Sequence, residues 1–373
     1  MKVLIVITKA VVGGAQTSVL NLAREMKKRG HEVAVGFGDG DWLPAELEKE
    51  NIPYHRFFWL KRTHNPLANL FFIGEIAVFL RGKNFTAVHF NSSNALPGAI
   101  GAKISGGKIR TVFTFRGMSI LDEHYQTAKW LKSCYWLFFK FFLLFVDVPV
   151  FVSRENFDKF GRGQLTAKGK LIYNGLDPAR LDFVSRDEAI GFFSRQSGRN
   201  LAGKYLIGSI GRLDYAKNYE FLINVFPQVS AIRPDAVAVI MGEGGERRLY
   251  ESLIKEKNLS DKIFLLGNVA NGSRYLRGFD LLVLPSRYEG LAISLIEGLM
   301  AGLPLLASRV GGNAEVAGDE KEIYALDNAE EFLKRFGDLQ EADILDKILK
   351  NNRQQAEKFN LRHTADGYEK IYQ

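Results

Sequence analysis

Short runs of consecutive apolar residues, each followed by a stretch of helical periodicity, constrain this chain more than any other feature of its sequence. The first run is KVLIVIT (2–8), and similar runs recur as far as residue 308. A strand that is buried on both faces is apolar throughout, and such strands belong to parallel sheets that helices cover on both sides. The alternation therefore predicts doubly wound α/β domains.

The first forty residues show the repeating unit most clearly. After the run at 2–8 come VVGGAQ (11–16), apolar residues at helical spacing as far as Met26, and a second apolar run, EVAVGF (32–37). Strand, glycine-rich turn, helix and strand make a βαβ unit. Further strands of this half are expected at 86–90, 110–115 and 148–153.

The same pattern starts again in the second half of the chain. Strands are expected there at 205–211, 236–242, 262–267, 281–285 and 304–308. Because 373 residues exceed one ordinary hydrophobic core, we expect two domains. We place the first at 1–170 and the second at 171–353, with KLIYNGLD (170–177) as the entry to the second domain and a helix at 354–373 completing the first. Ligands of such folds bind beyond the carboxyl ends of the strands, so two facing domains would form a cleft there.

Positive charge is concentrated in the first half. Residues 1–152 hold 19 Lys and Arg against 11 Asp and Glu, whereas residues 171–373 hold 26 against 29. A basic half predicts contact with an anionic partner. Nucleic acid is disfavoured as that partner, because the sequence has no zinc-finger spacing, no aromatic RNP-like strand and no basic helix with a dimer seam.

An aromatic stretch, WLKSCYWLFFKFFLLFVDVPVFV (130–152), favours a membrane surface instead. Lys132, Lys140 and Asp147 interrupt it, so no uncharged run reaches the ~18 residues that span a bilayer. Its aromatic residues exceed what one buried stripe needs, and basic residues among aromatic ones suit lipid headgroups. The single cysteine, Cys134, excludes an intramolecular disulfide and favours a reducing cytoplasm. We therefore expect a cytoplasmic protein that binds the anionic inner face of the cell membrane peripherally.

The strongest candidate site lies in residues 281–304. A buried strand at 281–285 and a helix at 291–302 are expected, with Glu289 between them and Glu297 inside the helix. If the whole stretch were helical, the two acids would lie about 12 Å apart, which is too far for a shared proton but suits the two ends of one long ligand. A helix N-terminus favours phosphate, and a carboxylate further along can accept hydrogen bonds from ribose hydroxyls. The layout fits a sugar nucleotide.

These segments resemble the retaining glycosyltransferases of family 4, which have the GT-B fold. Glu289 and Glu297 match the family's E-x7-E motif. The other matching segments, in order, are VVGGAQTSVLNLAREMKKRGHEV (11–33), YNGLD (173–177), SIGRLDYAKN (209–218), IMGEGGER (240–247), LGNV (266–269), PSRYEG (285–290) and SRVGGNAE (308–315). The resemblance covers almost the whole chain and implies two Rossmann-like domains facing a central cleft.

The resemblance also implies roles for the residues of the donor site. Arg212 and Lys217 would bind the donor diphosphate and stabilise the departing nucleoside diphosphate. Glu297 would bind the ribose, and Glu289 would bind hydroxyls of the transferred sugar and belong, with the two cations, to the catalytic residues. Further donor contacts are implied at Gly13, Gly14, Met241, Val269, Gly290, Leu291 and Ala292.

Two departures from the family pattern concern the acceptor. Many members have His-Gly after the strand that matches 110–115, and here Arg116 stands in place of the histidine. Arginine cannot act as a general base, but it can bind a phosphate or a carboxylate, so we keep Arg116 among the catalytic candidates. Gln16 replaces an acid that members often have in the glycine loop. Asn91, Ser92 and Ser93 follow the strand at 86–90 and complete the candidate acceptor contacts.

The activity implied is transfer of a sugar, with retention and without a metal or cofactor, from a nucleotide diphosphate to an acceptor hydroxyl. UDP-sugars are the first choice of donor and GDP-mannose the second, and the expected acceptor is a lipid-linked saccharide or a cell-surface glycan precursor. Two alternatives keep the fold: a non-catalytic nucleotide-sugar binding module and a sugar-nucleotide 2-epimerase. A dehydrogenase is disfavoured, because neither half has G-x-G-x-x-G followed by an acid about twenty residues on.

Overall fold

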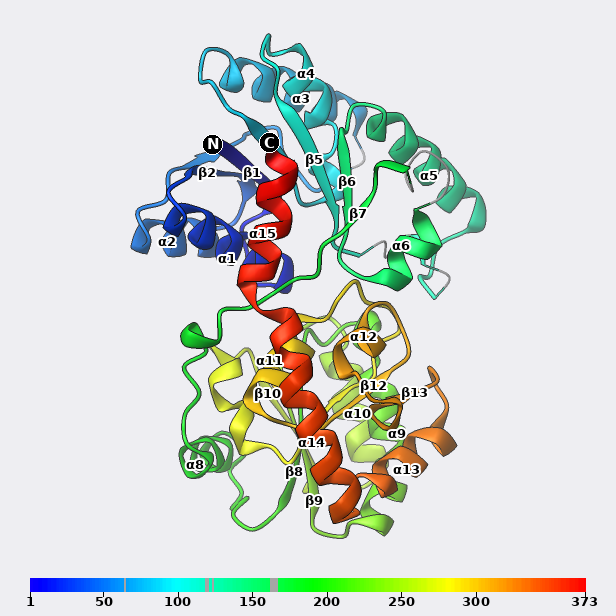
Figure 1. The fold of residues 1–373 in the computed structure, drawn as a ribbon. Coiled ribbons are helices and arrows are strands. Elements are labelled where there is room, and N and C mark those ends of the chain that lie inside the picture. Colours follow the sequence, from blue (N-terminus) through cyan, green and yellow to red (C-terminus); the bar gives the residue numbers. More distant parts are fainter. Residues whose placement is uncertain (64, 118–120, 123, 162–166) are drawn as a thin grey trace. The chain divides into compact units, whose positions relative to one another are not determined.

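The computed structural model describes residues 1–63, 65–117, 121–122, 124–161 and 167–373. The chain divides into two compact units, one of residues 1–176 with 359–373 and one of residues 177–358. Each unit is built on a parallel sheet with helices on its faces (Figure 1). These divisions lie a few residues beyond the predicted boundaries at 170 and 353.

The first unit holds a seven-stranded sheet in the order β3-β2-β1-β4-β5-β6-β7. The strands are β1 (Lys2–Lys9), β2 (Glu32–Asp39), β3 (Tyr54–Arg56), β4 (Ala87–Phe90), β5 (Arg110–Phe115), β6 (Val148–Phe151) and β7 (Lys170–Leu171). Every pairing is parallel. The order of the strands reverses between β1 and β4, which makes this the topological switch point of the sheet.

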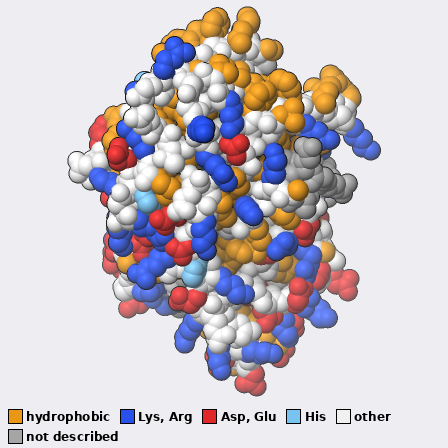
Figure 2. Space-filling model, turned by 45° about the horizontal axis from the view of Figure 1, so that its top comes forward, with side chains coloured by type: hydrophobic (Ala, Val, Ile, Leu, Met, Phe, Trp, Pro, Cys, Tyr) orange, Lys and Arg blue, Asp and Glu red, His pale blue; other side chains and the backbone are white. Residues whose placement is uncertain are grey.

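Helices cover both faces of this sheet. They are α1 (Gly14–Lys28), α2 (Trp42–Lys49), α3 (Pro66–Leu80), α4 (Gly98–Ile104), α5 (Lys129–Leu143), α6 (Arg154–Phe160) and α15 (Leu361–Tyr372), with a short 3-10 turn η1 (Ser93–Ala95). Alternate residues of β1 face opposite layers, as a strand requires. Leu4 and Val6 join a core cluster with α3, α4 and α5. The outer side of this helix layer is unusually apolar, and hydrophobic side chains gather on the upper part of Figure 2.

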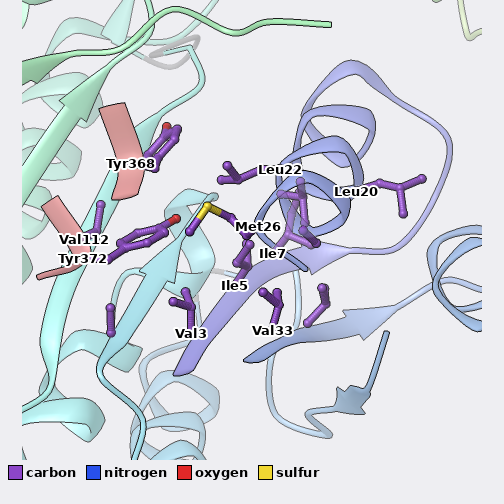
Figure 3. Packing of buried hydrophobic residues seen from close by; sticks show 14 of the residues in the cluster. Val3, Ile5, Ile7, Leu20, Leu22, Met26, Val33, Val112, Tyr368 and Tyr372 are labelled. Atoms are coloured by element: carbon purple, nitrogen blue, oxygen red, sulfur yellow. The ribbon is translucent and has the colours of Figure 1, made fainter. Parts of the chain in front are cut away.

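The other face of the sheet packs on α1, α2 and α15. Val3, Ile5 and Ile7 of β1 point toward Met26 of α1 and toward the tyrosines of α15 (Figure 3). Tyr368 and Tyr372 are almost fully buried there. The C-terminal helix therefore belongs to the core of the first unit, although 182 residues of the second unit separate it from the rest in the sequence.

Strand β7 corrects one expectation. Lys170 and Leu171 pair with Val150 and Phe151 of β6, so KLIYNGLD begins in the first unit and does not open the second. A short apolar run indicates a strand but does not indicate which sheet the strand joins, because that depends on neighbours far away in the sequence.

The second unit holds a six-stranded parallel sheet in the order β10-β9-β8-β11-β12-β13. Its strands are β8 (Tyr205–Ile210), β9 (Ala236–Met241), β10 (Ile263–Gly267), β11 (Leu281–Leu284), β12 (Leu305–Ser308) and β13 (Ile323–Tyr324). Its α-helices are α8 (Arg186–Ser197), α9 (Tyr219–Ile232), α10 (Arg247–Glu256), α11 (Ile293–Ala301), α12 (Asn313–Ala317), α13 (Ala329–Asp338) and α14 (Ala342–Ala356). The switch point lies between β8 and β11. Two doubly wound parallel sheets confirm the predicted fold class.

Candidate functional site

Lys217 and Glu289 form an ion pair at the switch point of the second unit. Lys217 lies in the 3-10 turn η4 (Tyr215–Lys217) after β8, and Glu289 follows β11. Lys217 Nζ donates to Glu289 Oε1 at 2.6 Å, and the two side chains are only 18% and 14% exposed. Ser286 Oγ donates to the same oxygen at 2.7 Å. The pairing of β8 with β11 thus brings together two candidates that lie far apart in the sequence.

Two glycines allow the backbone to close around this ion pair. A Cβ on Gly211 would lie 3.0 Å from Cε of Lys217. Gly311 has a φ of 52°, and a Cβ there would lie 2.2 Å from the carbonyl oxygen of Glu289. The positive φ and the close backbone contact require a glycine at 311, whereas the contact at Gly211 is with the side chain of Lys217.

Arg212 lies one residue beyond Gly211 at the carboxyl end of β8. Its side chain is 72% exposed, and its Nη2 contacts Asp214 Oδ2 at 2.7 Å. An exposed guanidinium can turn toward a ligand at little cost, because water already surrounds it. The structure therefore places two of the candidate cations after the same strand, Lys217 in a largely buried ion pair and Arg212 in an exposed one.

Glu297 lies on α11 against the 3-10 helix η5 (Gly272–Gly278). Burial raises the pKa of Glu297 to about 7, and the hydrogen bond from Ser273 offsets part of that rise. A Cβ on Gly272 would lie 3.6 Å from Met241 Sδ and 3.7 Å from Val269 Cβ. The carboxylate and the two apolar candidates for the base pocket therefore gather around the first turn of η5. Ser273 is a contact that the sequence analysis missed, since no motif marked it.

Helix α11 begins later than predicted. Ala292 is its N-cap residue with extended dihedral angles, so Gly290, Leu291 and Ala292 precede the first turn of α11 and do not form it. The separation of about 12 Å between the two acids, which assumed a continuous helix, is therefore not the geometry of this segment. No described side chain caps α11, and the N–H groups of its first turn remain candidates for an anion.

In the first unit, Arg116 and Asn91 meet at the carboxyl ends of β5 and β4. Arg116 Nε and Nη2 donate to Asn91 Oδ1 at 3.1 and 2.7 Å. Arg116 Nη1 donates to Asn174 Oδ1. Asn174 lies within YNGLD and is buried, and the sequence analysis did not single it out. Three residues from distant parts of the chain therefore form one cluster.

Gln16 and Ser92, two further candidates of the first unit, form hydrogen bonds within that unit. Gln16 Nε2 donates to the carbonyl oxygen of Lys9 at 2.9 Å. Ser92 Oγ accepts from the N–H of Thr8 at 2.9 Å and lies 2.6 Å from its hydroxyl. These two side chains link β1 to its neighbours, and a role toward an acceptor stays a prediction for both.

Ser93, Gly13 and Gly14 lie at the starts of helical segments. Ser93 opens η1 and hydrogen-bonds Tyr135. Gly13 is the N-cap of α1, where a Cβ would lie 2.7 Å from Gln16 Oε1, and Gly14 begins the helix. Neither glycine carries a Cβ that would keep a ligand from the backbone, and a role toward the donor stays a prediction for both.

Comparison with known proteins agrees with this arrangement. Residues 12–180 match the family model for Glycosyltransferase Family 4, and residues 192–356 match that for Glycosyl transferases group 1. An uncharacterized glycosyltransferase of Methanocaldococcus jannaschii is 36% identical over 153 residues, which cover 40% of this chain and 38% of that protein. The N-acetylgalactosamine-N,N'-diacetylbacillosaminyl-diphospho-undecaprenol 4-alpha-N-acetylgalactosaminyltransferase of Campylobacter jejuni is 30% identical over 187 residues, covering 49% of this chain and 47% of the relative. The chain thus aligns with less than half the length of each of these two relatives.

The fold has a counterpart among solved structures. Anabaena HepE in complex with UDP-glucose superimposes with a TM-score of 0.81 at 21% sequence identity, covering 100% of this chain and 99% of the other. The two family models run from residue 12 to residue 356 with a short gap, one on each sheet. The chain therefore belongs to the glycosyltransferases of the GT-B fold, with a family 4 model on its first unit and a group 1 model on its second.

Proposed function

We propose that this protein is a retaining, metal-independent glycosyltransferase that transfers a sugar from a UDP-sugar to an acceptor hydroxyl. One observation carries the proposal: Arg212 and Lys217 follow β8, and Glu289 follows β11, at the carboxyl edge of one parallel sheet, where ligands of this fold bind. Glu297 lies on α11, the helix that follows β11. Two cations and two acids suit an elongated ligand with a diphosphate between two hydroxylated rings.

The cations act on the leaving group. As the bond between the sugar and the diphosphate breaks, negative charge develops on the phosphate oxygen, and Lys217 and Arg212 stabilise it. Lys217 is already fixed by Glu289 and needs little reorganisation to meet a phosphate. The two positive charges and the N-terminus of α11, which no described side chain caps, supply the charge that a divalent cation supplies elsewhere.

The nucleoside lies toward η5. Ionised Glu297 accepts hydrogen bonds from ribose hydroxyls, and Met241 and Val269 pack on the base. A uracil base is favoured because the similar Anabaena HepE structure contains UDP-glucose.

A thermal-shift screen with UDP, GDP, ADP and TDP tests the donor. We expect UDP to stabilise the protein most strongly, and we expect Glu297→Ala to abolish that shift because the ribose loses its charged acceptor. Glu256→Ala, an exposed glutamate at the end of α10, is the matched control and should keep the wild-type shift. An unchanged UDP shift in Glu297→Ala contradicts the assignment of the ribose site.

The acceptor proposed is lipid-linked, and the surface of the first unit supports a membrane location. The outer sides of α3 and α5 expose large apolar residues: Leu67, Leu70, Phe71 and Val78 on α3, and Trp130, Leu131, Leu137, Phe138 and Phe141 on α5. We call these residues the apolar surface. None of the described helices is long and apolar enough to cross a bilayer.

The occupant of the apolar surface is inferred to be an anionic bilayer. Apart from Asn69 and Glu75, helix α3 is apolar on all its sides, a composition typical of a helix covered on every side. Lys61, Lys83 and Lys140 lie beside aromatic rings of this layer, with Nζ 4.5, 3.5 and 5.4 Å from the ring centroids of Phe58, Phe79 and Trp136. Apolar and aromatic side chains with lysines among them suit the boundary between headgroups and acyl chains. The Campylobacter relative, named for a diphospho-undecaprenol substrate, agrees with such a location.

Vesicle binding tests this surface. We expect the wild type to co-sediment at low salt with vesicles that contain phosphatidylglycerol, and salt should weaken the binding. Replacing Trp130, Leu137 and Phe141 together by serine should lower partitioning at least about tenfold, since each buried apolar side chain contributes roughly 1.5–3 kcal/mol. The control pair, Ile232→Ser and Leu249→Ser, removes exposed apolar residues from the second unit. Failure of the wild type to bind such vesicles contradicts the proposal.

A further inference from the structure

Arg116 carries a positive charge that no described carboxylate neutralises. Its hydrogen-bond partners among the described residues are the amide oxygens of Asn91 and Asn174, which orient the guanidinium but bring no charge. Burial lowers the pKa of Arg116 from its ordinary value. A half-buried cation whose only partners in the described chain are neutral amides is unfavourable unless a ligand supplies the anion.

The groups beneath Arg116 are also neutral. His89 Nδ1 and Nε2 lie 2.7 Å from Tyr372 Oη and from Thr114 Oγ1, so both ring nitrogens are used inside the core. Burial, and in smaller part the charge of Arg116, holds the pKa of His89 well below its ordinary value. The core beneath the guanidinium therefore adds no compensating charge.

Among the described residues, two N–H groups of the guanidinium have no hydrogen-bond partner. It has five N–H donors, and the hydrogen bonds to Asn91 and Asn174 use the Nε–H, one N–H of Nη2 and one of Nη1. One N–H remains on each Nη. Asn91 is itself fixed, because its Nδ2 donates to the carbonyl oxygen of His89 at 3.2 Å, which turns its Oδ1 to the arginine. The structure thus holds the guanidinium in one orientation, with two N–H donors that no described residue uses.

The position of Arg116 is that of a ligand site. It follows the carboxyl end of β5, and Asn91 follows that of β4, beside the switch point with β1. The glycine loop and the N-terminus of α1 follow β1 at the same edge of the sheet, and the first turn of α1 contains no acidic residue. Ligands of doubly wound sheets bind at this edge.

We propose that Arg116 binds an oxyanion of a substrate, a phosphate or carboxylate group, through its two remaining N–H groups. The inference rests on the proposed function, since it assigns part of the substrate of that same enzyme. Two sources share this chemistry: an anionic group on the acceptor, and the diphosphate of the donor.

Titrations with three small sugars test the acceptor source. At saturating UDP, we expect the wild type to bind glucose 1-phosphate or glucuronate at least about tenfold more tightly than neutral glucose, which is the scale of a charge-assisted pair of hydrogen bonds. Arg116→Gln should lose this preference. Arg116→Lys keeps the charge but not the two parallel N–H donors of the guanidinium, so its preference should lie between those of the wild type and Arg116→Gln. Arg110→Gln is the matched control, because Arg110 is an exposed arginine at the opposite end of β5.

UDP affinity, measured for the same variants, tests the donor source. A loss of at least about tenfold in Arg116→Gln, with the sugar titrations unchanged, identifies the oxyanion as the donor's diphosphate. The proposal is overturned if Arg116→Gln keeps both the wild-type UDP affinity and the wild-type response to the anionic sugars. If Arg116→Gln does not fold, as judged by its melting curve, Arg116→Lys carries the test.

Failure of the proposed function gives a different result. In that case the wild type does not bind UDP, and the sugar titrations are made without nucleotide. A preference for the anionic sugars that disappears in Arg116→Gln still supports the oxyanion site, and no preference in the wild type overturns it.

Discussion

Replacing Lys217 by alanine is expected to lower the rate of sugar transfer by about a hundredfold or more. The substitution removes the cation that is fixed at the switch point of the second sheet. Removing one preorganised group that stabilises the charge of a transition state lowers kcat by about this factor. It also leaves the largely buried carboxylate of Glu289 without its lysine partner. The measurement is transfer of radiolabelled sugar from UDP-glucose to a bacterial lipid extract.

The control for this experiment is Lys255→Ala, an exposed lysine in the last turn of α10. A Lys217→Ala enzyme that transfers sugar at the wild-type rate refutes the proposed role. The same assay separates the alternatives that keep this fold. A free sugar released without any acceptor favours a 2-epimerase, and tight UDP binding by a wild type with no turnover favours a binding module.

Replacing Glu322 by glutamine is expected to stabilise the protein in alkaline solution. Glu322 is fully buried, and its Oε1 accepts hydrogen bonds from the N–H of Leu305 at 2.7 Å and from Asn352 Nδ2 at 2.8 Å. Its other oxygen has no partner among the described residues, and no described cation pairs with the carboxylate. Burial raises the pKa of Glu322 to about 8. The carboxyl group is therefore structural, and its charged form is unfavourable in the folded chain.

The sign of the pH effect follows from proton binding. Between the ordinary glutamate pKa and about 8, the folded protein holds a proton that the unfolded chain has released, so the free energy of unfolding falls as the pH rises through this window. The full effect is at most roughly 5 kcal/mol. Glutamine keeps the accepting oxygen and cannot ionise. The variant should lose this pH dependence and exceed the wild type in stability above about pH 8.

Urea unfolding from pH 5 to pH 9 measures the difference. Glu320→Gln is the neighbouring control, because the hydrogen bond from Arg309 lowers the pKa of this exposed carboxyl and it does not titrate in the same range. Parallel stability curves for the wild type and Glu322→Gln across the whole range contradict the prediction.

The sequence by itself determined the fold class, and it predicted a set of residues for the donor site. Strands such as β1 and β9 are buried on both faces, so their runs are apolar throughout and are visible without any knowledge of their partners. The E-x7-E spacing is also visible in the sequence alone, since Glu289 and Glu297 lie on one segment that runs from β11 into α11. Strands β3 and β13 escaped prediction because two or three residues are too few to show a period.

Only the tertiary structure decided which of these residues meet. The contact of Lys217 with Glu289, the neutral partners of Arg116 and the place of β7 in the first sheet all depend on strand order, which joins segments that are distant in the chain. Exposure is decided in the same way: Cys134 and much of α5 face outward, although the helix is rich in apolar residues. A local pattern records how apolar a segment is, whereas the neighbours that cover it are set by packing across the whole unit.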